Sequence, residues 1–300
     1  MELAPIVLFV YNRPWHTRQT LEALTKNDLA DKSVLYIYAD GPKIGSTNED
    51  QKKIEDVRKI IREKKWCNEV VIIEEEQNKG LVHSVIEGVS QVVNRSEKII
   101  VLEDDLVTSQ GFLKYMNEVL NMYSDSQNIW SVTGYMFPLA YKTEPRTVVL
   151  PYISTWGWGT WKEKWISFVE AKHHYNLGKN PSLIKRFNLS DYDYSSMLKN
   201  NRQTSWGIRW YFHVFCFNGL SVFPTQSLLA NIGKDGSGTN YTTIDNSLEP
   251  IICPTISVKK VESIDLLFLD KYLEYFTKKE PIKSGIFSKL KSLIKGKFIL

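Results

Sequence analysis

The chain has 300 residues, and 43% of them are hydrophobic. This is enough for one large or two modest domains and gives no sign of disorder. The net charge of +4 comes from 38 basic and 34 acidic residues, and five of the lysines fall in residues 283–300, which contain no acid. The rest of the chain is close to neutral, which excludes a basic body built to bind nucleic acid.

The two ends of the chain predict its location. Glu2 stands where a secretory signal carries basic residues, and the apolar run APIVLFVY is too short to span a membrane. We therefore expect a cytoplasmic protein. Residues 283–300 mix lysines with apolar side chains at helical spacing, which fits a helix on the anionic inner face of a membrane as well as a segment docked on the protein body.

In the first half, apolar runs alternate with stretches of helical periodicity. Strands are expected at residues 5–11, 34–40, 69–75, 99–102 and near 129–135, and helices from Pro14, over Ile54 to Ile61, over residues 80–93 and over Phe112 to Leu120. In the third helix, Leu81, Val82, Val85, Val89 and Val92 should face inward. This alternation predicts an α/β fold with a mainly parallel central sheet and helices on both faces.

Polar residues follow three of the predicted strands directly. Asn12 and Arg13 follow the first and Asp40 ends the second, whereas Glu103, Asp104 and Asp105 close the apolar strand IIVL. Because ligands bind at the carboxyl ends of parallel strands, we expect one shared crevice. Three adjacent carboxylates need a cation, hydrogen-bond donors or open water. Mg²⁺ or Mn²⁺ together with a nucleoside diphosphate satisfies that need.

Other uses of the acidic triplet have less support in the sequence. No GxGxxG follows the first strand, no GxxxxGK[ST] is present, and the triplet lacks the alternating oxygen ligands of a calcium loop. The five histidines show no HExxH spacing. These patterns argue against a dinucleotide site, a P-loop enzyme, an EF-hand and a zinc hydrolase.

The order VLFVYNRP, YADGPK, NKGLVHSV and VLEDD resembles GT-A glycosyltransferases, in particular bacterial sugar transferases similar to animal N-acetylglucosaminyltransferase I. The likeness runs from residue 4 to about residue 245. It implies a Rossmann-like GT-A fold in which residues 1–140 bind the donor, residues 141–262 bind the acceptor, and residues 263–300 form a helical tail. In that family, a Glu-Asp-Asp triplet holds the metal ion.

The resemblance also implies roles for single residues. Asp105 would bind Mn²⁺ or Mg²⁺, Asp104 the ribose or the metal's water shell, and Glu103 would lie near the donor sugar. The remaining donor contacts would be Asp40 with the uracil N3–H, Arg13 with the nucleotide, and His83 with the base or the diphosphate. From the residues alone, Asp40 is as well explained by a turn before Gly41, Arg13 by the surface and His83 by a helix face.

The second half is rich in aromatic residues and carries the acceptor role. In TWGWGTW, glycines interrupt the tryptophans, which predicts a loop with flat aromatic faces for a sugar ring. The resemblance assigns Gly157 and Trp158 to the donor-sugar pocket, although tryptophans more often fill cores. The loop with Gly233, Gly236 and Gly238 would cover the donor phosphates, with Ser237 as a donor, or be an ordinary flexible loop. A metal role for Asn240 is in doubt because relatives often carry His there.

The general base is the weakest part of the resemblance. Gly207, in SWGIRW, stands where the family has the Asp that deprotonates the acceptor. Asp235 is the substitute that we expect, with Asp191, Asp193 and Glu103 as competitors, and a turn before Gly236 explains Asp235 equally well.

The sequence as a whole favours a metal-dependent inverting glycosyltransferase. It would move a sugar from a UDP-sugar to a glycan or lipid-linked acceptor in bacterial surface polysaccharide synthesis. A nucleotidyltransferase should have a glycine-rich, basic phosphate loop after the first strand, which YNRPWHT lacks. An idle sugar- or nucleotide-binding protein of the same fold is the other alternative, and Gly207 is its best support.

Overall fold

A large central sheet organises the protein. The structure, a computed structural model, describes residues 2–171, 176–201, 204–238, 250 and 252–277. Within these residues the strands of the main sheet are β1 (Ile6–Val10), β2 (Val34–Ala39), β3 (Glu69–Glu74), β4 (Lys98–Glu103), β6 (Ile129–Thr133), β7 (Thr147–Leu150), β8 (Trp158–Trp161) and β9 (Leu220–Pro224). Their order across the sheet is β3-β2-β1-β4-β8-β6-β9-β7. Strands β3, β2, β1 and β4 run parallel, while β8 and β7 run antiparallel to their neighbours.

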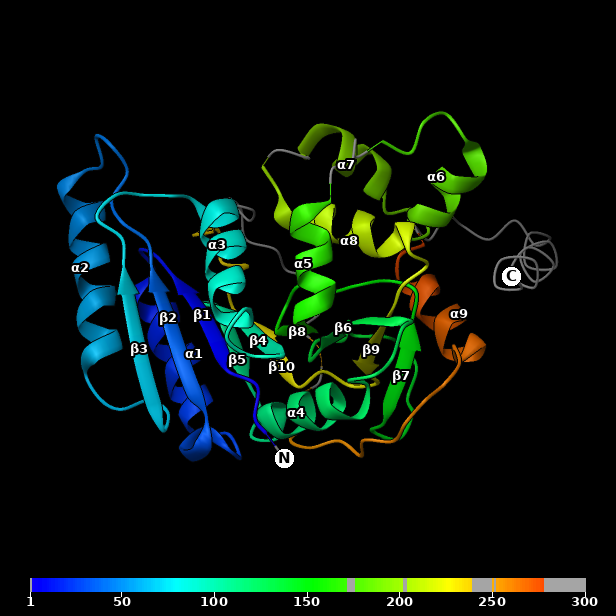
Figure 1. The fold of residues 1–300 in the computed structure, drawn as a ribbon, viewed down its shortest axis with the longest axis horizontal. Coiled ribbons are helices and arrows are strands. Elements are labelled where there is room, and N and C mark those ends of the chain that lie inside the picture. Colours follow the sequence, from blue (N-terminus) through cyan, green and yellow to red (C-terminus); the bar gives the residue numbers. More distant parts are fainter. Residues whose placement is uncertain (1, 172–175, 202–203, 239–249, 251, 278–300) are drawn as a thin grey trace.

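Helices cover both faces of this sheet (Figure 1). One face packs against α1 (Pro14–Thr25), α2 (Asn48–Arg62) and α4 (Phe112–Met122). The other face packs against α3 (Leu81–Val93), α5 (Lys162–Glu170), α8 (Trp206–Cys216) and α9 (Leu266–Tyr275). The shorter elements are η1 (Ala30–Lys32), α6 (Pro181–Phe187), α7 (Tyr194–Asn201) and a two-stranded sheet of β5 (Leu106–Thr108) and β10 (Leu229–Asn231). The predicted α/β class with a mainly parallel sheet is confirmed.

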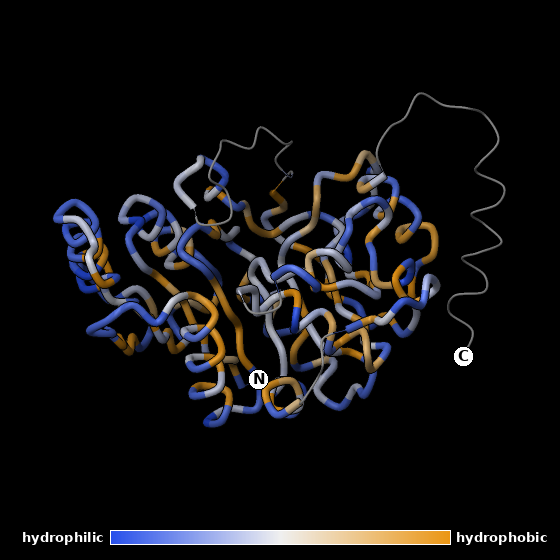
Figure 2. The backbone as a smooth tube through the Cα atoms, turned by 90° about the horizontal axis from the view of Figure 1, so that it is seen from above, coloured by the Kyte–Doolittle hydropathy of each residue, from blue (hydrophilic) through white to orange (hydrophobic). Residues whose placement is uncertain are grey.

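Strand β1 shows why the apolar runs become central strands. Ile6 and Leu8 are fully buried against α1 and α2, and their neighbours Val7 and Phe9 are buried in the cluster on the opposite face. A strand with both faces covered must be apolar at every position. Figure 2 shows such hydrophobic stretches running along the strands, with hydrophilic segments toward the outside.

The predicted helices and strands of the first half all form, with one error in their packing. Leu81 is 40% exposed, so its predicted burial is wrong. It is the first residue of α3, whose packing against the core begins with the partly buried Val82 and becomes complete at Val85. The strands β5 and β10 could not be predicted from the sequence because each has three residues, which are too few to show a periodic pattern.

The sheet does not divide near residue 140. Strand β8, from the second half of the chain, lies between β4 and β6 of the first half. Residues on the two sides of that position therefore share one sheet, and the donor and acceptor halves remain a prediction about function. Of the predicted tail, α9 packs into the core through Phe268, Leu269 and Tyr272. Residues 283–300 lie outside the described residues.

The prediction of an exposed aromatic loop at TWGWGTW is wrong. Trp158 begins β8, is 1% exposed, and its ring centroid lies 5.2 Å from that of Trp206. Gly157 has a φ of +57°, and a Cβ there would lie 2.2 Å from Leu229 Cδ2. This glycine is therefore explained by close packing and a left-handed backbone rather than by an open loop.

Within the part of the chain that the structure describes, no helix is both long and apolar enough to cross a membrane.

Candidate functional site

The carboxyl ends of β1, β2 and β4 meet at one edge of the sheet. Because β1 pairs in parallel with both of the others, the segments that follow these strands emerge side by side. Arg13 follows β1, Asp40 follows β2, and the acidic triplet follows β4. The predicted convergence of three strand ends is therefore present in the fold.

Arg13 and two of the acids form the centre of the site. Its Nη2 contacts Asp104 Oδ1 and lies 2.8 Å from Asp105 Oδ2, while its Nε is 3.4 Å from Asp104 Oδ2. The three side chains are only 17%, 7% and 14% exposed. Thr20 Oγ1 donates a 2.8 Å hydrogen bond to the Asp104 carbonyl and thereby joins α1 to the end of β4.

Burial sets the protonation of these acids. It raises the pKa of Glu103 to about 8, with further contributions from the charges of Asp105 and Asp104. It also raises the pKa of Asp104 to about 6, although Arg13 opposes this shift. The two aspartates in turn raise the pKa of Arg13 further, against the effect of its own burial. Near neutral pH, Glu103 is thus mainly neutral and the guanidinium is the cation that faces the aspartates.

The loop after β10 lies directly on this site. Strand β10 pairs with β5, which begins one residue after Asp105, so that Asn231 stands opposite Leu106. Ile232 N donates a 2.9 Å hydrogen bond to the Asp105 carbonyl. A Cβ on Gly233 would lie 2.1 Å from Asp105 Oδ2 and 2.9 Å from Arg13 Nη1. Only glycine therefore lets the main chain come this close to the carboxylate.

Asp235, farther along the same loop, is held by neighbours on both of its oxygens. Oδ1 accepts hydrogen bonds from the Ser237 main-chain N–H at 3.0 Å and from its hydroxyl at 2.6 Å. The Ser237 hydroxyl is the main reason that the pKa of Asp235 is lowered. Oδ2 lies 3.1 Å from His16 Nε2, in a contact that lacks the alignment of a hydrogen bond. His16 is 5% exposed and belongs to α1.

Sequence reasoning gave His16 no role. It is one of five histidines, none of which has metal-ligand spacing. Its neighbour Trp15, whose side chain is 58% exposed, stacks edge-on against it with ring centroids 4.9 Å apart. No signal in the sequence links α1 to a loop more than two hundred residues away, since that contact arises only when β10 pairs with β5.

Asp40 holds a neighbouring loop. Its Oδ1 accepts from the N–H groups of Gly41 at 2.9 Å and Lys79 at 2.8 Å, and its Oδ2 from Asn78 Nδ2 at 2.9 Å and Gly80 N at 3.0 Å. These four donors fill the acceptor positions of a carboxylate. An interaction with a uracil N3–H, as the resemblance implies, would have to displace one of them.

The other predicted donor residues lie in different surroundings. His83 is exposed on the first turn of α3. The burial of Trp158 leaves no ring face for a sugar. Gly157 packs against Leu229 just before β8.

The competing bases also have defined places. Gly207 lies in the first turn of α8, where a Cβ would meet Thr155 Cγ2 at 3.4 Å, an ordinary contact. Asp193 accepts from both hydroxyls of Ser195 and Ser196 at 2.6 Å, and these bonds lower its pKa strongly. Asn240 is outside the described residues.

A metal ion would have Asp105 as its protein ligand. The described residues contain no group of three His, Cys, Asp or Glu side chains that could hold a metal. A hard cation such as Mg²⁺ needs only one or two carboxylates when phosphate oxygens and water complete its shell. Arg13 contacts Oδ2 of Asp105, and among the described residues no group donates a hydrogen bond to its Oδ1. The residues therefore fit a cation brought together with a diphosphate.

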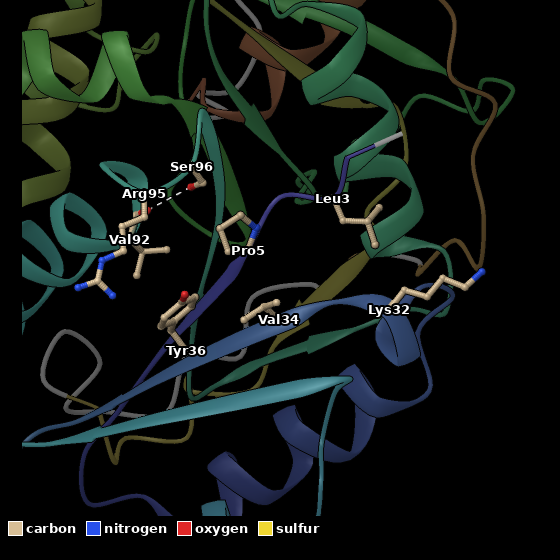
Figure 3. A pocket seen from close by; sticks show the side chains of 8 residues that line it. All are labelled: Leu3, Pro5, Lys32, Val34, Tyr36, Val92, Arg95 and Ser96. Carbon is tan, nitrogen blue, oxygen red and sulfur yellow. Dashed lines mark hydrogen bonds between the residues drawn. The ribbon is translucent and has the colours of Figure 1, made fainter.

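A separate cavity of about 300 Å³ lies at the other end of the sheet. Figure 3 shows its lining, in which Pro5 precedes β1, Val34 and Tyr36 belong to β2, and Val92 lies in the last turn of α3 with Arg95 and Ser96 close by. These are the amino ends of β1 and β2, so the cavity is not part of the site around Arg13 and the acids.

Comparisons with known proteins give distant likenesses. No protein-family model and no curated protein matches the chain. Among solved structures, S. aureus TarS is similar at 14% identity with a TM-score of 0.35, over 71% of this chain and 34% of TarS. GalNAc-T7 with UDP, GalNAc and Mn²⁺ is similar at 12% identity with a TM-score of 0.41, over 74% of this chain and 41% of that one.

Mouse xyloside xylosyltransferase 1 is similar at 11% identity with a TM-score of 0.38, over 71% of this chain and 81% of that one. The matches to TarS and GalNAc-T7 thus cover less than half of those proteins. A shared function does not follow from such TM-scores, and the side chains at the sheet edge carry the functional argument.

Proposed function

We propose that the protein is a metal-dependent inverting glycosyltransferase of the GT-A type that uses a UDP-sugar as donor. The observation that carries this proposal is the glycine loop lying on Asp105 beside Arg13. A half-buried carboxylate and a guanidinium meet at the carboxyl ends of parallel strands, directly against the main chain at Gly233. This is the arrangement that a charged diphosphate and its cation require.

The roles follow from the contacts. Asp105 would hold Mn²⁺ or Mg²⁺, which when bound neutralises charge on the departing diphosphate. Asp104, fixed by Arg13 and Thr20, would position the ribose or the metal's water shell. The loop that carries Gly233 and Ser237 would cover the phosphates.

The nucleoside and the donor sugar would lie on either side of these phosphates. Asp40, through the loop that it holds, and His83, at the exposed start of α3, would flank the nucleoside. Glu103, neutral at pH 7, would donate a hydrogen bond to the sugar. Gly157 would shape the wall of the sugar pocket behind Phe112 and Leu229.

The acceptor proton needs a base, and Asp235 remains our proposal for it. Its side chain is 45% exposed, so an acceptor hydroxyl can approach it. Its lowered pKa keeps it ionised at neutral pH, which makes it a weak but available base. The contact with His16 fixes the carboxylate in the loop. The acceptor would be a glycan or a lipid-linked sugar in bacterial surface polysaccharide synthesis, and GlcNAc is the donor sugar that the resemblance favours.

Removal of the Asp105 carboxylate is the first test. Asp105→Ala should lower transfer and donor hydrolysis by about 100-fold or more, because charge on the leaving diphosphate is no longer neutralised. UDP release from a panel of UDP-sugars with Mn²⁺ measures this, and calorimetry measures UDP binding. Asp56→Ala removes an exposed carboxylate from α2 and is the control. Full transfer by Asp105→Ala would refute the central claim.

A binding protein of the same fold without catalysis is the second candidate. Gly207 on α8 favours it, because no carboxylate stands at that helix start. Such a protein would bind UDP with Mn²⁺ but would not release UDP from any UDP-sugar, even over hours. Slow hydrolysis by the wild type that is lost in Asp105→Ala would exclude it. A nucleotidyltransferase would instead release pyrophosphate from a nucleoside triphosphate.

The basic end of the chain has a separate proposed role. Residues 283–300 would place a cytoplasmic enzyme on the anionic inner face of the membrane, close to lipid-linked acceptors. Removal of these residues should weaken sedimentation with anionic liposomes and spare donor hydrolysis. Unchanged sedimentation would contradict this role.

A further inference from the structure

The carboxylate proposed to hold a divalent cation already has a cation beside it. Arg13 Nη2 lies 2.8 Å from Asp105 Oδ2 and also contacts Asp104 Oδ1. With the Arg13 side chain 17% exposed and those of the aspartates 7% and 14% exposed, little water screens these charges. A metal ion bound to Asp105 would therefore be repelled strongly by the positive charge of the Arg13 guanidinium.

We propose that Arg13 is an internal counter-ion that competes with the divalent cation for Asp105 and that turns from the aspartates to the diphosphate when the nucleotide binds. This inference rests on the proposed function and adds an order to it. Metal and nucleotide each strengthen the binding of the other, because each favours the state in which Arg13 has left the carboxylates. Without nucleotide, Arg13 neutralises the site and the metal binds weakly.

The competition follows from charge. A guanidinium does not lose its proton in proteins, so it cannot yield to the metal by becoming neutral. It must either move or repel the metal. Asp105 Oδ1 is left for the metal, but the same carboxylate cannot interact fully with two cations that repel each other.

The geometry also gives Arg13 somewhere to turn. Its Nε and Nη2 contact the aspartates, and among the described residues its Nη1 donates no hydrogen bond. Nη1 lies beside Gly233, where a Cβ would be only 2.9 Å away, and its N–H groups are donors that the aspartates do not use. Arginine binds phosphate through two parallel N–H groups, which rewards such a rotation.

The main chain at Arg13 stays fixed during this exchange. Thr17 donates to the Arg13 carbonyl from its N–H at 3.0 Å and from its hydroxyl at 2.9 Å. Pro14, the first residue of α1, restricts the main chain of Arg13 before it. The Arg13 side chain can therefore turn without a change in the main chain that carries it.

Binding of Mn²⁺ to the full chain tests the inference. Electron paramagnetic resonance would measure the Mn²⁺ dissociation constant with and without UDP, corrected for Mn²⁺ held by free UDP. In the absence of UDP, Arg13→Met should bind Mn²⁺ about tenfold more tightly than the wild type, and the gain in affinity caused by UDP should shrink by the same factor. Arg18→Met removes a guanidinium from the same helix, where it pairs with exposed Glu63, and should behave as the wild type.

The possible outcomes separate the two claims. If phosphates alone recruited the metal, Arg13→Met would leave the nucleotide-free Mn²⁺ affinity unchanged or weaker, and the inference would be overturned. Arg13→Lys replaces the forked guanidinium by a single ammonium group, so its Mn²⁺ affinity without nucleotide should rise less than that of Arg13→Met. If Arg13→Met failed to fold, an unchanged Mn²⁺ affinity in Arg13→Lys would still overturn the inference. A wild type that binds UDP but never Mn²⁺ also overturns it. A wild type that binds no UDP defeats the proposed function itself.

Discussion

The acidic edge around Arg13 and the aromatic core around Trp158 both hold side chains that are largely shielded from water, but different interactions stabilise them. At the edge, carboxylates at the end of β4 are balanced by one guanidinium and approached by a glycine loop. In the core, Trp158 packs with ring centroids 5.2 to 6.2 Å from those of Trp206, Trp165 and Trp210. Charge and specific contacts define the first region, whereas shape and apolar area define the second.

This difference teaches how each region tolerates change. A charge cluster loses function when one atom is moved, because its energy depends steeply on distance. An aromatic cluster loses stability when volume is removed, because neighbouring rings cannot collapse into the space. Substitutions in each region test this division.

Trp158→Ala should have the largest effect on stability. Truncation of a buried aromatic side chain typically lowers the free energy of unfolding by about 3–5 kcal/mol. Urea denaturation followed by circular dichroism would measure it. Trp15→Ala removes a tryptophan that is 58% exposed and should change stability by no more than about 0.5 kcal/mol. Equal losses in the two variants would break the comparison.

Gly233→Ala should impair activity far more than folding. The added Cβ would lie 2.1 Å from Asp105 Oδ2, so either the loop or the carboxylate must shift. We expect donor hydrolysis to fall by about 100-fold, the usual cost of a misplaced catalytic group. Gly178→Ala is the control, since a Cβ there would have nothing within 4 Å; Gly178, unlike Gly233, has a positive φ of +65°, so the control carries the backbone strain without the contact. Similar activity of both variants would show that the loop does not serve the site.

Glu103→Gln should have the smallest effect near pH 4, and one that grows as the pH rises. The pKa of Glu103 is about 8 in the folded protein against 4.5 ordinarily, so the folded state holds the proton more firmly. Its ionisation therefore lowers stability as pH rises from about 4.5 through 8. Glu103→Gln should melt about 2 °C or more above the wild type at pH 9 without metal, and equally near pH 4. A difference that does not depend on pH would contradict the raised pKa.

Much of the fold could be predicted from the sequence, since every strand and helix expected in the first half forms. The acidic triplet and Arg13 could be found as well, because a charged residue after a fully apolar strand is unusual and parallel strands bring their ends together. The exposed aromatic loop was the main error. Local propensity predicts a loop throughout TWGWGTW, whereas tertiary packing makes Trp158–Trp161 a central strand that begins directly after Gly157.

The contacts that complete the site could not be predicted. Asp40 binds the loop at Asn78, Lys79 and Gly80, and Arg13 binds both aspartates rather than an open surface. A motif gives residue types in order, but it does not say which donors reach a carboxylate first. These partners depend on loop conformations that no periodic pattern encodes.

The layers of the fold and the position of the charged edge follow from the amino-acid sequence alone, because hydrophobic periodicity and strand ends are local signals that do not depend on distant contacts. The contacts that the charged side chains make depend on the tertiary structure. The pairing of β10 with β5 brings Gly233 onto Asp105 and Asp235 to His16, and the turn after β1 brings Arg13 onto the aspartates. Such contacts join segments that are far apart in the chain, and their energies depend on distances that exist only once the sheet has formed.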